Sequence, residues 1–232
     1  ATKYDGLKSA VKNIKNFIKQ DTIILSLLNG VTSEEIIAQQ YGKEHLLLSY
    51  FIGHSAMRNG SIITHDGVGK IFFGDGGEFI YPESKTNIQL VKEFFNRVGI
   101  EYEIPDDMFR SLWLKYMLNI SSNQPSAILK MTFGQMQKNE ELIKFMIEIM
   151  KEVQIFAKKE GVSNTETMLE EALSAFKTMS ADGKTSMYQD IEAGRKTEVD
   201  MFAGHIIELG AKYNVPTPYN KVLKEMIDIL SF

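Results

Sequence analysis

The spacing of apolar residues changes near Pro105, and this change constrains the fold more than any other feature of the sequence. Before Pro105, short β-branched apolar runs alternate with segments whose apolar residues recur every three or four positions. The first pattern is typical of buried strands and the second of amphipathic helices. After Pro105, the helical spacing continues almost alone. We therefore expect an α/β domain over residues 1–104 and an all-helical domain over residues 105–232.

Each half can be divided further by period and by turn residues. In helix 84–98 the period places Leu90, Val91, Phe94 and Phe95 toward the core. In the first half we expect helix 7–18, strand 22–28, helix 32–40, strand 46–57, a hairpin around Asp66-Gly67 within 60–74, helix 84–98 and strand 100–104. In the second half we expect helices over 107–130, 140–160, 164–180, 186–193, 197–213 and 218–231.

Three segments have the residue types of helix N-terminal caps. Thr32–Glu35 and Ser186–Gln189 fit the capping-box pattern, in which a hydroxyl and a carboxyl or amide three positions later bind each other's backbone N–H groups. Thr197–Asp200 has a hydroxyl suited to cap the following helix. Capping alone would account for Ser186 and Thr197.

Composition narrows the class of protein. The 232 residues carry 26 Lys plus Arg against 30 Asp plus Glu, a net charge of −4, which argues against a nucleic-acid-binding protein. The longest apolar stretches, 23–28 and 46–52, are far shorter than the roughly 18–20 residues of a membrane-spanning helix. The chain has no cysteine, which excludes disulfides and thiolate metal sites. We expect a cytoplasmic protein that binds neither nucleic acid nor membranes.

Two familiar kinds of site are disfavoured. The histidines His45, His54, His65 and His205 are too widely spaced for a helical metal pair, so no metal site is expected. The glycines at 67–77 resemble a nucleotide loop, but a strand-like KIFFG follows Gly69 where a helix would be needed. Hairpin turns are the better interpretation. The sequence contains neither GxGxxG nor GxxxxGK[ST].

A polar stripe runs through an otherwise apolar helical segment. Lys115, Asn119 and Asn123 are four residues apart, and each step of four rotates only about 40° around a helix, so the three share one face. Burying an ammonium or an amide without partners costs several kcal/mol. The stripe is therefore either a solvent-facing surface or the polar wall of a groove with one positive charge.

Two further positions are candidates for function. Glu198 lies just before an apolar helical segment, where the helix dipole favours its ionised form, and its simplest interpretation is a surface carboxylate. Asn29-Gly30 follows a buried strand, at the end where open α/β sheets bind ligands. The same pair is also a common turn.

Together these patches resemble one family. The chain resembles the 2-dehydropantoate 2-reductase (ketopantoate reductase) family in the order and spacing of four motifs, and the resemblance covers essentially the whole chain. The motifs are the strand ending in NGV, then WLKxxxNxxxNxxxAI, TSMxQDIEAGRKTEVDxxxG and VPTPxN. The resemblance implies a Rossmann-like NADP-binding α/β domain followed by a helical substrate and dimerisation domain. It also implies NADPH-dependent reduction of ketopantoate to pantoate, in pantothenate and coenzyme A biosynthesis.

The resemblance assigns roles by motif. Lys115 and Glu198 match the catalytic lysine and its acidic partner, and Glu198 also faces the cofactor. Asn119, Asn123 and Ser186 match substrate-binding positions. Lys3 and Asn29 match cofactor-binding positions. Hydride addition to a ketone produces an alkoxide, which needs a proton and a positive charge together, and a lysine ammonium supplies both.

The chain departs from the family pattern in one large respect. The family's nucleotide fingerprint lies in its first βαβ unit, whereas this sequence begins at ATKYDG, which resembles the middle of the nucleotide domain. We therefore expect a partial nucleotide domain, weak NADPH binding and impaired turnover. The strand 22–28 would then have an uncovered edge, which invites a homodimer.

Two alternatives stay open beside ketopantoate reduction. One is an NADPH-dependent reductase of another 2-oxo acid, because pocket shape sets the substrate. The other is a non-catalytic binding or dimerisation fragment of the same fold.

Overall fold

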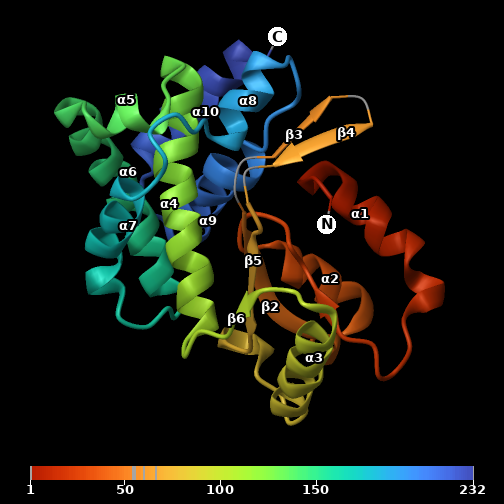
Figure 1. The fold of residues 1–232 in the computed structure, drawn as a ribbon. Helices are drawn as coiled ribbons and strands as arrows, with labels where there is room; N and C mark the ends of the chain where they lie inside the picture. The colour runs from red at the N-terminus through yellow and green to blue at the C-terminus, as the bar shows by residue number, and fades with distance from the viewer. Residues whose placement is uncertain (1, 54–55, 60, 66, 232) are drawn as a thin grey trace. The chain divides into compact units, whose positions relative to one another are not determined.

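The structure, a computed structural model, describes residues 2–53, 56–59, 61–65 and 67–231. The chain forms two compact units, Ala1–Leu112 and Trp113–Phe232, and each is described by itself below. The first is α/β and the second is helical (Figure 1), which confirms the predicted fold class of α/β followed by all-α. The division falls within one long helix, α4 (Met108–Leu129).

The first unit is built on a mixed sheet of four strands in the order β1-β2-β5-β6. The β1–β2 and β5–β6 pairs are parallel and the β2–β5 pair is antiparallel. The strands are β1 (Ile24–Leu25), β2 (Leu46–Ile52), β5 (Lys70–Gly74) and β6 (Tyr102–Glu103), with a separate hairpin of β3 (Ala56–Asn59) and β4 (Ile62–His65). The helices are α1 (Tyr4–Asn13), α2 (Ser33–Tyr41) and α3 (Ser84–Val98), with short 3-10 turns at Lys15–Phe17, Lys43–His45 and Gly77–Phe79.

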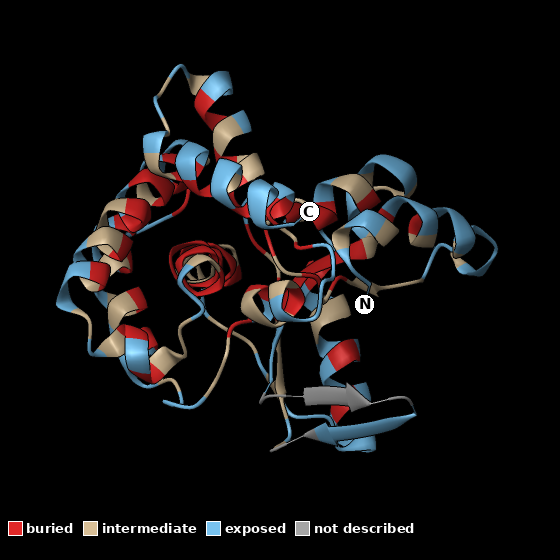
Figure 2. Cartoon of the chain, turned by 90° about the horizontal axis from the view of Figure 1, so that it is seen from above, coloured by how far each residue is buried: buried red, intermediate tan, exposed pale blue. Residues whose placement is uncertain are grey.

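The second unit consists of helices packed around the body of α4. Seen from above, α4 is viewed end-on and its buried residues are ringed by the other helices of the unit (Figure 2). No helix of the described residues is long and apolar enough to cross a membrane. The other helices are α5 (Phe133–Gln137), α6 (Glu140–Lys159), α7 (Met168–Lys177), α8 (Ser186–Glu192), α9 (His205–Tyr213) and α10 (Pro218–Leu230), with a 3-10 turn at Thr165–Thr167 and a π-helical turn, η5, at Asp200–Gly204.

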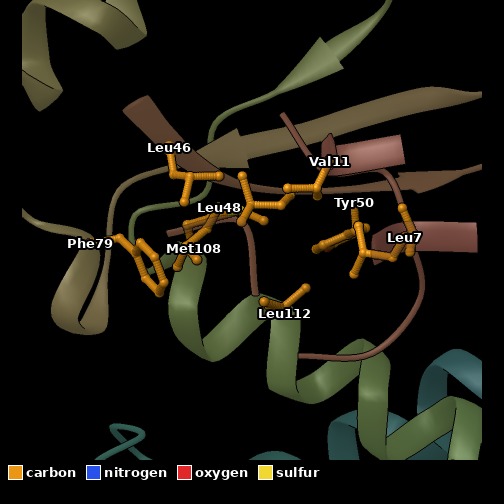
Figure 3. Packing of buried hydrophobic residues seen from close by; sticks show 10 residues of the cluster. Leu7, Val11, Leu46, Leu48, Tyr50, Phe79, Met108 and Leu112 are labelled. Carbon is orange, nitrogen blue, oxygen red and sulfur yellow. The ribbon is translucent and has the colours of Figure 1, made fainter. Parts of the chain in front are cut away.

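Strand β2 organises the core of the first unit by its period of two. Leu46, Leu48 and Tyr50 point to one face, where they pack with α1, α2 and the start of α4 (Figure 3). Leu47 points to the other face and packs with residues of β5 and α3. Full burial of each such side chain stabilises the fold by roughly 1.5–3 kcal/mol. Both faces are therefore covered over Leu46–Tyr50, whereas Phe51 and Ile52 at the end of β2 are exposed.

Three sequence predictions about the first unit are wrong in detail. Leu90 and Phe94 are 51% and 47% exposed, so the core face of α3 is narrower than predicted and includes Val91 and Phe95. The side chain of Thr32 makes no capping hydrogen bond, although α2 begins directly after it. The strand predicted at 46–57 is divided into β2 and β3.

The hairpin is also placed differently from the prediction. Strand β3 pairs with β4 in the register Asn59↔Ile62, so the chain reverses before Ile62 rather than between β4 and β5. Strand β5 instead joins the main sheet beside β2, because Phe73 on β5 packs into the core on the same face as Leu47. The predicted turn residue Asp66 lies outside the described residues.

The predicted strand at 22–28 is reduced to the two residues of β1. It lies at one end of the four-stranded sheet. That a second copy of the chain covers this edge stays a prediction.

A buried carboxyl group lies at the start of α2. Glu34 is buried, and the Ser33 hydroxyl donates to its Oε2 at 2.7 Å. Ser26 Oγ lies 2.7 Å from Ser33 Oγ, and Ser49 Oγ donates to the Ser26 carbonyl at 2.8 Å. Burial raises the pKa of Glu34 to about 7, although the bond from Ser33 opposes the shift.

This carboxyl group makes stability depend on pH. Between pH 4.5 and 7 the folded chain holds a proton on Glu34 that the unfolded chain releases, so the free energy of unfolding falls as pH rises through this window. We expect Glu34→Gln to be more stable than the wild type at pH 8, by up to about 3 kcal/mol, and close to it at pH 4.5. Urea unfolding at the two pH values measures this. The exposed Glu44→Gln is the control, and an equal effect of Glu34→Gln at both pH values would contradict the account.

Candidate functional site

The predicted polar stripe lies on α4, the central helix of the second unit. Lys115 and Asn119 are half-buried, and Asn123 is 6% exposed. The stripe is therefore not a fully solvated face. Asn123 is the most buried of the three.

Asn123 joins α4 to the N-terminus of α8. Its Oδ1 accepts a hydrogen bond from Ser186 Oγ at 3.1 Å and one from the Met187 backbone N–H at 3.4 Å. Its Nδ2 donates to the Asn119 carbonyl one turn earlier, at 3.0 Å. The amide is thus held from both sides, and Asn119, Asn123 and Ser186 form one connected group. This arrangement satisfies a polar side chain that would otherwise be costly to bury.

The cap of α8 is Thr185, and the prediction of Ser186 as the capping residue is wrong. Thr185 Oγ1 accepts from the Tyr188 N–H at 3.2 Å and lies 3.1 Å from Ser126 Oγ on α4, to which it donates. Thr185 is buried, whereas Ser186 is exposed. The Ser186 hydroxyl is therefore turned toward Asn123 instead of the helix end.

Glu198 lies two residues before the π-helical turn η5 and is half-buried. Its carbonyl accepts from the N–H groups of Met201 at 3.0 Å and Phe202 at 3.2 Å. The predicted cap at Thr197 is wrong, because the N-cap residue of η5 is Val199 and no side chain caps this turn. The backbone of Glu198 is fixed by the first amides of η5.

The two predicted cofactor contacts of the first unit lie at element ends. Lys3 is exposed and extended, directly before α1. Asn29 is half-buried in the segment between β1 and α2, and Gly30 after it has φ 88°, a conformation that favours glycine. Asn29-Gly30 was predicted to follow directly on a buried strand, but it lies in a bend that begins four residues beyond the end of β1.

The rest of the described chain offers two further observations. Among the described residues, no group of three or more His, Asp or Glu side chains is placed to hold a metal ion. A cavity of about 330 Å³ in the first unit is lined by α2 and the segment 78–79, with Glu35, Gln39 and Lys43 at its wall. It contains none of the residues predicted to be catalytic or to bind substrate or cofactor.

Both units match models of one protein family, the family that the sequence motifs resemble. Residues 107–231 match the model of the ketopantoate reductase PanE/ApbA C-terminal domain, and residues 1–78 match that of ketopantoate reductase PanE/ApbA. The chain is 30% identical over 229 residues to a 2-dehydropantoate 2-reductase of Pyrococcus horikoshii. That match covers 97% of this chain and 72% of the relative.

Solved structures share the fold. D-mandelate dehydrogenase in complex with NADH and anilino(oxo)acetate is 25% identical, with a TM-score of 0.88, and the match covers all of this chain and 74% of that one. A 2-dehydropantoate 2-reductase from Geobacter metallireducens is 24% identical with a TM-score of 0.86, over 99% of this chain and 75% of that one. The second likeness shows the fold alone.

The corrected cap is testable by paired substitutions. We expect Thr185→Ala to lower the free energy of unfolding by about 1–2 kcal/mol, because it removes the cap of α8 and leaves Ser126 without this contact. Ser186→Ala should cost roughly 0.5 kcal/mol or less, because Asn123 Oδ1 keeps the bond from the Met187 N–H. Urea unfolding of both variants measures the difference, and a larger loss at Ser186 would restore the original capping assignment.

Proposed function

The chain belongs to the ketopantoate reductase family, and from this premise we propose that its substrate is 2-dehydropantoate, reduced to pantoate at the expense of NADPH in the route to pantothenate and coenzyme A. The observation that carries the proposal is the connected group of Asn119, Asn123 and Ser186, with Lys115 one helical turn before Asn119 on the same helix. A buried amide at Asn123, with a half-buried asparagine and a lysine on the same helix face, suits a small polar anion such as a 2-oxo acid.

Lys115 is the proposed proton donor. Reduction of the keto group places negative charge on its oxygen, and an ammonium near that oxygen both neutralises the charge and delivers a proton. Glu198 is the proposed partner that orients the ammonium and keeps it protonated until the substrate is bound. Its place just before η5 fixes its backbone, which limits the positions that its carboxylate can take.

Asn119, Asn123 and Ser186 are the proposed substrate contacts. The Nδ2 group of Asn123 carries two protons, of which one is donated to the Asn119 carbonyl. The second proton suits a carboxylate or hydroxyl oxygen of the substrate. The exposed Ser186 hydroxyl can accept from a substrate hydroxyl while it donates to Asn123.

The donors of the first unit suit a nicotinamide dinucleotide. Lys3 offers an ammonium for a phosphate, and Asn29 offers a carboxamide in the turn after β1. In the second unit, Glu198 is the further residue that the family resemblance assigns to the cofactor. When bound, the cofactor supplies the hydride. The 232 residues contain no GxGxxG, and the chain spans 72% of the length of the Pyrococcus relative.

A second candidate is reduction of a different 2-oxo acid. The likeness to D-mandelate dehydrogenase with NADH, at 25% identity, favours it. Initial rates with 2-dehydropantoate and with the 2-oxo acid that corresponds to mandelate, each with NADPH and NADH, distinguish the two. Higher kcat/KM for 2-dehydropantoate with NADPH supports the first proposal. Binding of neither acid would favour a non-catalytic module.

Substitution of Lys115 tests the proton donor. We expect Lys115→Ala to lower kcat by about 10²–10⁴-fold, because it removes both the proton and the charge at the developing alkoxide. The KM for the 2-oxo acid should change little, since the alkoxide exists only near the transition state. NADPH oxidation measures both constants, with the exposed Lys177→Ala as control. An unimpaired Lys115→Ala enzyme would refute the assignment.

Cofactor affinity is expected to limit turnover by the 232-residue chain. Without a glycine-rich pyrophosphate fingerprint in these residues, NADPH should bind weakly, and the rate should be near background at micromolar NADPH. Isothermal titration calorimetry with NADPH, and separately with 2-dehydropantoate, tests this. Submillimolar binding of the acid with weak binding of NADPH is the expected pattern, whereas tight NADPH binding would overturn it.

A further inference from the structure

One buried hydroxyl group connects the two segments that carry Lys115 and Glu198. Tyr116 follows Lys115 on α4, is 1% exposed, and its hydroxyl donates to the carbonyls of Met201 at 2.9 Å and Phe202 at 3.0 Å. Both carbonyls belong to η5, the π-helical turn that begins two residues after Glu198. This side chain therefore links the segment that carries Lys115 to the segment that follows Glu198.

The backbone of η5 completes the connection. The N–H groups of the same two residues, Met201 and Phe202, donate to the Glu198 carbonyl. The Gly204 N–H bonds to the Val199 carbonyl at 3.1 Å, the five-residue spacing of a π-turn. Such π-turns are rare and occur mostly as single turns at helices, frequently at functional sites. Tyr116 supplies a contact from outside the turn at the peptide groups that bind Glu198.

The ring of Tyr116 is fixed as firmly as its hydroxyl. Its centroid lies 5.7 Å from that of Trp113, in an edge-to-face arrangement, and 6.2 Å from the rings of Phe202 and His205. Successive residues of a helix point about 100° apart, so Tyr116 faces the helical core while Lys115 projects in a different direction from the same backbone. A rigid Tyr116 therefore couples the position of the Lys115 backbone to that of η5.

A second contact holds η5 from another helix. Lys224 on α10 places its Nζ 2.9 Å from Asp200 Oδ1, at the first residue of η5, and 2.8 Å from Asp228 Oδ2. Its side chain is 26% exposed, so the energy of this ion pair is modest. The turn is thus held by a buried hydroxyl from α4 and by a partly exposed ammonium from α10.

We propose that Tyr116 is a positioning residue for the reaction, and that its bonds to η5 set the spacing between the Lys115 ammonium and the Glu198 carboxylate. The inference rests on the proposed function, in which these two groups act as a pair. Tyr116 itself touches neither substrate nor cofactor in this account. Its hydroxyl acts through the carbonyls of Met201 and Phe202.

The test measures the ionisation of Lys115 and needs no turnover. The 232-residue chain is treated with a trace of acetic anhydride across a range of pH, and acetylation of each lysine is quantified by mass spectrometry. Because only the neutral amine reacts, the curve for Lys115 gives its apparent pKa. The exposed Lys177 is the reference within each sample.

We expect Tyr116→Phe to lower the apparent pKa of Lys115 by about 0.5–1 unit, because a Glu198 carboxylate held less firmly stabilises the ammonium less. Glu198→Gln should lower it at least as much, and Tyr116→Phe should add nothing in the Glu198→Gln background. The control is Tyr213→Phe, whose hydroxyl donates to Glu160 Oε1 at 2.8 Å on a different part of the unit, and it should leave Lys115 unchanged. If Tyr116→Phe does not fold, Lys224→Gln replaces it, with a smaller shift in the same direction.

The outcomes distinguish failure of the positioning role of Tyr116 from failure of the proposed Lys115–Glu198 pair. If Glu198→Gln moves the Lys115 curve but neither Tyr116→Phe nor Lys224→Gln does, the positioning role is refuted and the pair survives. If Glu198→Gln leaves the curve unchanged, the Lys115–Glu198 pair fails, and the inference fails with it. An equal shift from Tyr213→Phe would show a general loss of structure and would also refute the specific role.

Discussion

Polar side chains on a helix buried among other helices are costly unless they find partners, and this constraint shapes the second unit. Among the described residues, Gln124 Oε1 is the one buried side-chain polar atom without a hydrogen-bond partner. Along α4, Ser122 Oγ and Gln124 Nε2 donate back to carbonyls one turn earlier. Asn123 and Tyr116 instead reach to other segments, the start of α8 and the turn η5. The polar residues of α4 therefore decide where α8 and η5 dock. The same contacts that satisfy buried groups also place Ser186 and Glu198.

The helices were the most predictable part of the fold. Residues 84–98 form a helix with the predicted bounds, α4 is one residue shorter than predicted at each end, and α10 ends one residue earlier than predicted. In these segments, large apolar residues at a 3.6-residue period were sufficient to predict a helix and its approximate ends. The short helix α5 was not predicted, because five residues are too few to show a period. It begins at a full capping box between Thr132 and Gln135.

Strand lengths and caps were less predictable because both depend on distant parts of the chain. A β-branched run such as 22–28 has the composition of a strand, but only Ile24 and Leu25 pair with β2. At α8 the predicted cap was Ser186, but the preceding Thr185 is the cap. The hydroxyl of Thr185, which caps α8, also donates a hydrogen bond to Ser126, 59 residues earlier in the chain. No local pattern contains that information.

The site residues differ in how the sequence could find them. The stripe of Lys115, Asn119 and Asn123 was visible as three polar residues at one helical phase, and family resemblance supplied their proposed roles. From its neighbours in the sequence alone, Glu198 is predicted to be a surface carboxylate. In the structure it is half-buried and lies before η5. Tyr116 gave no signal, since a tyrosine in an apolar helix is ordinarily core. Its importance depends on two carbonyls 85 and 86 residues away.

The central claim is that α4, the start of α8 and the segment at Glu198 form one 2-oxo acid site. The most direct measurement is a titration of the isotope-labelled chain with 2-dehydropantoate, followed by amide and side-chain NMR. The account predicts saturable shifts concentrated at Lys115, Asn119, Asn123, Ser186 and Glu198. Shifts confined to other residues, or no saturation at millimolar acid, would contradict it.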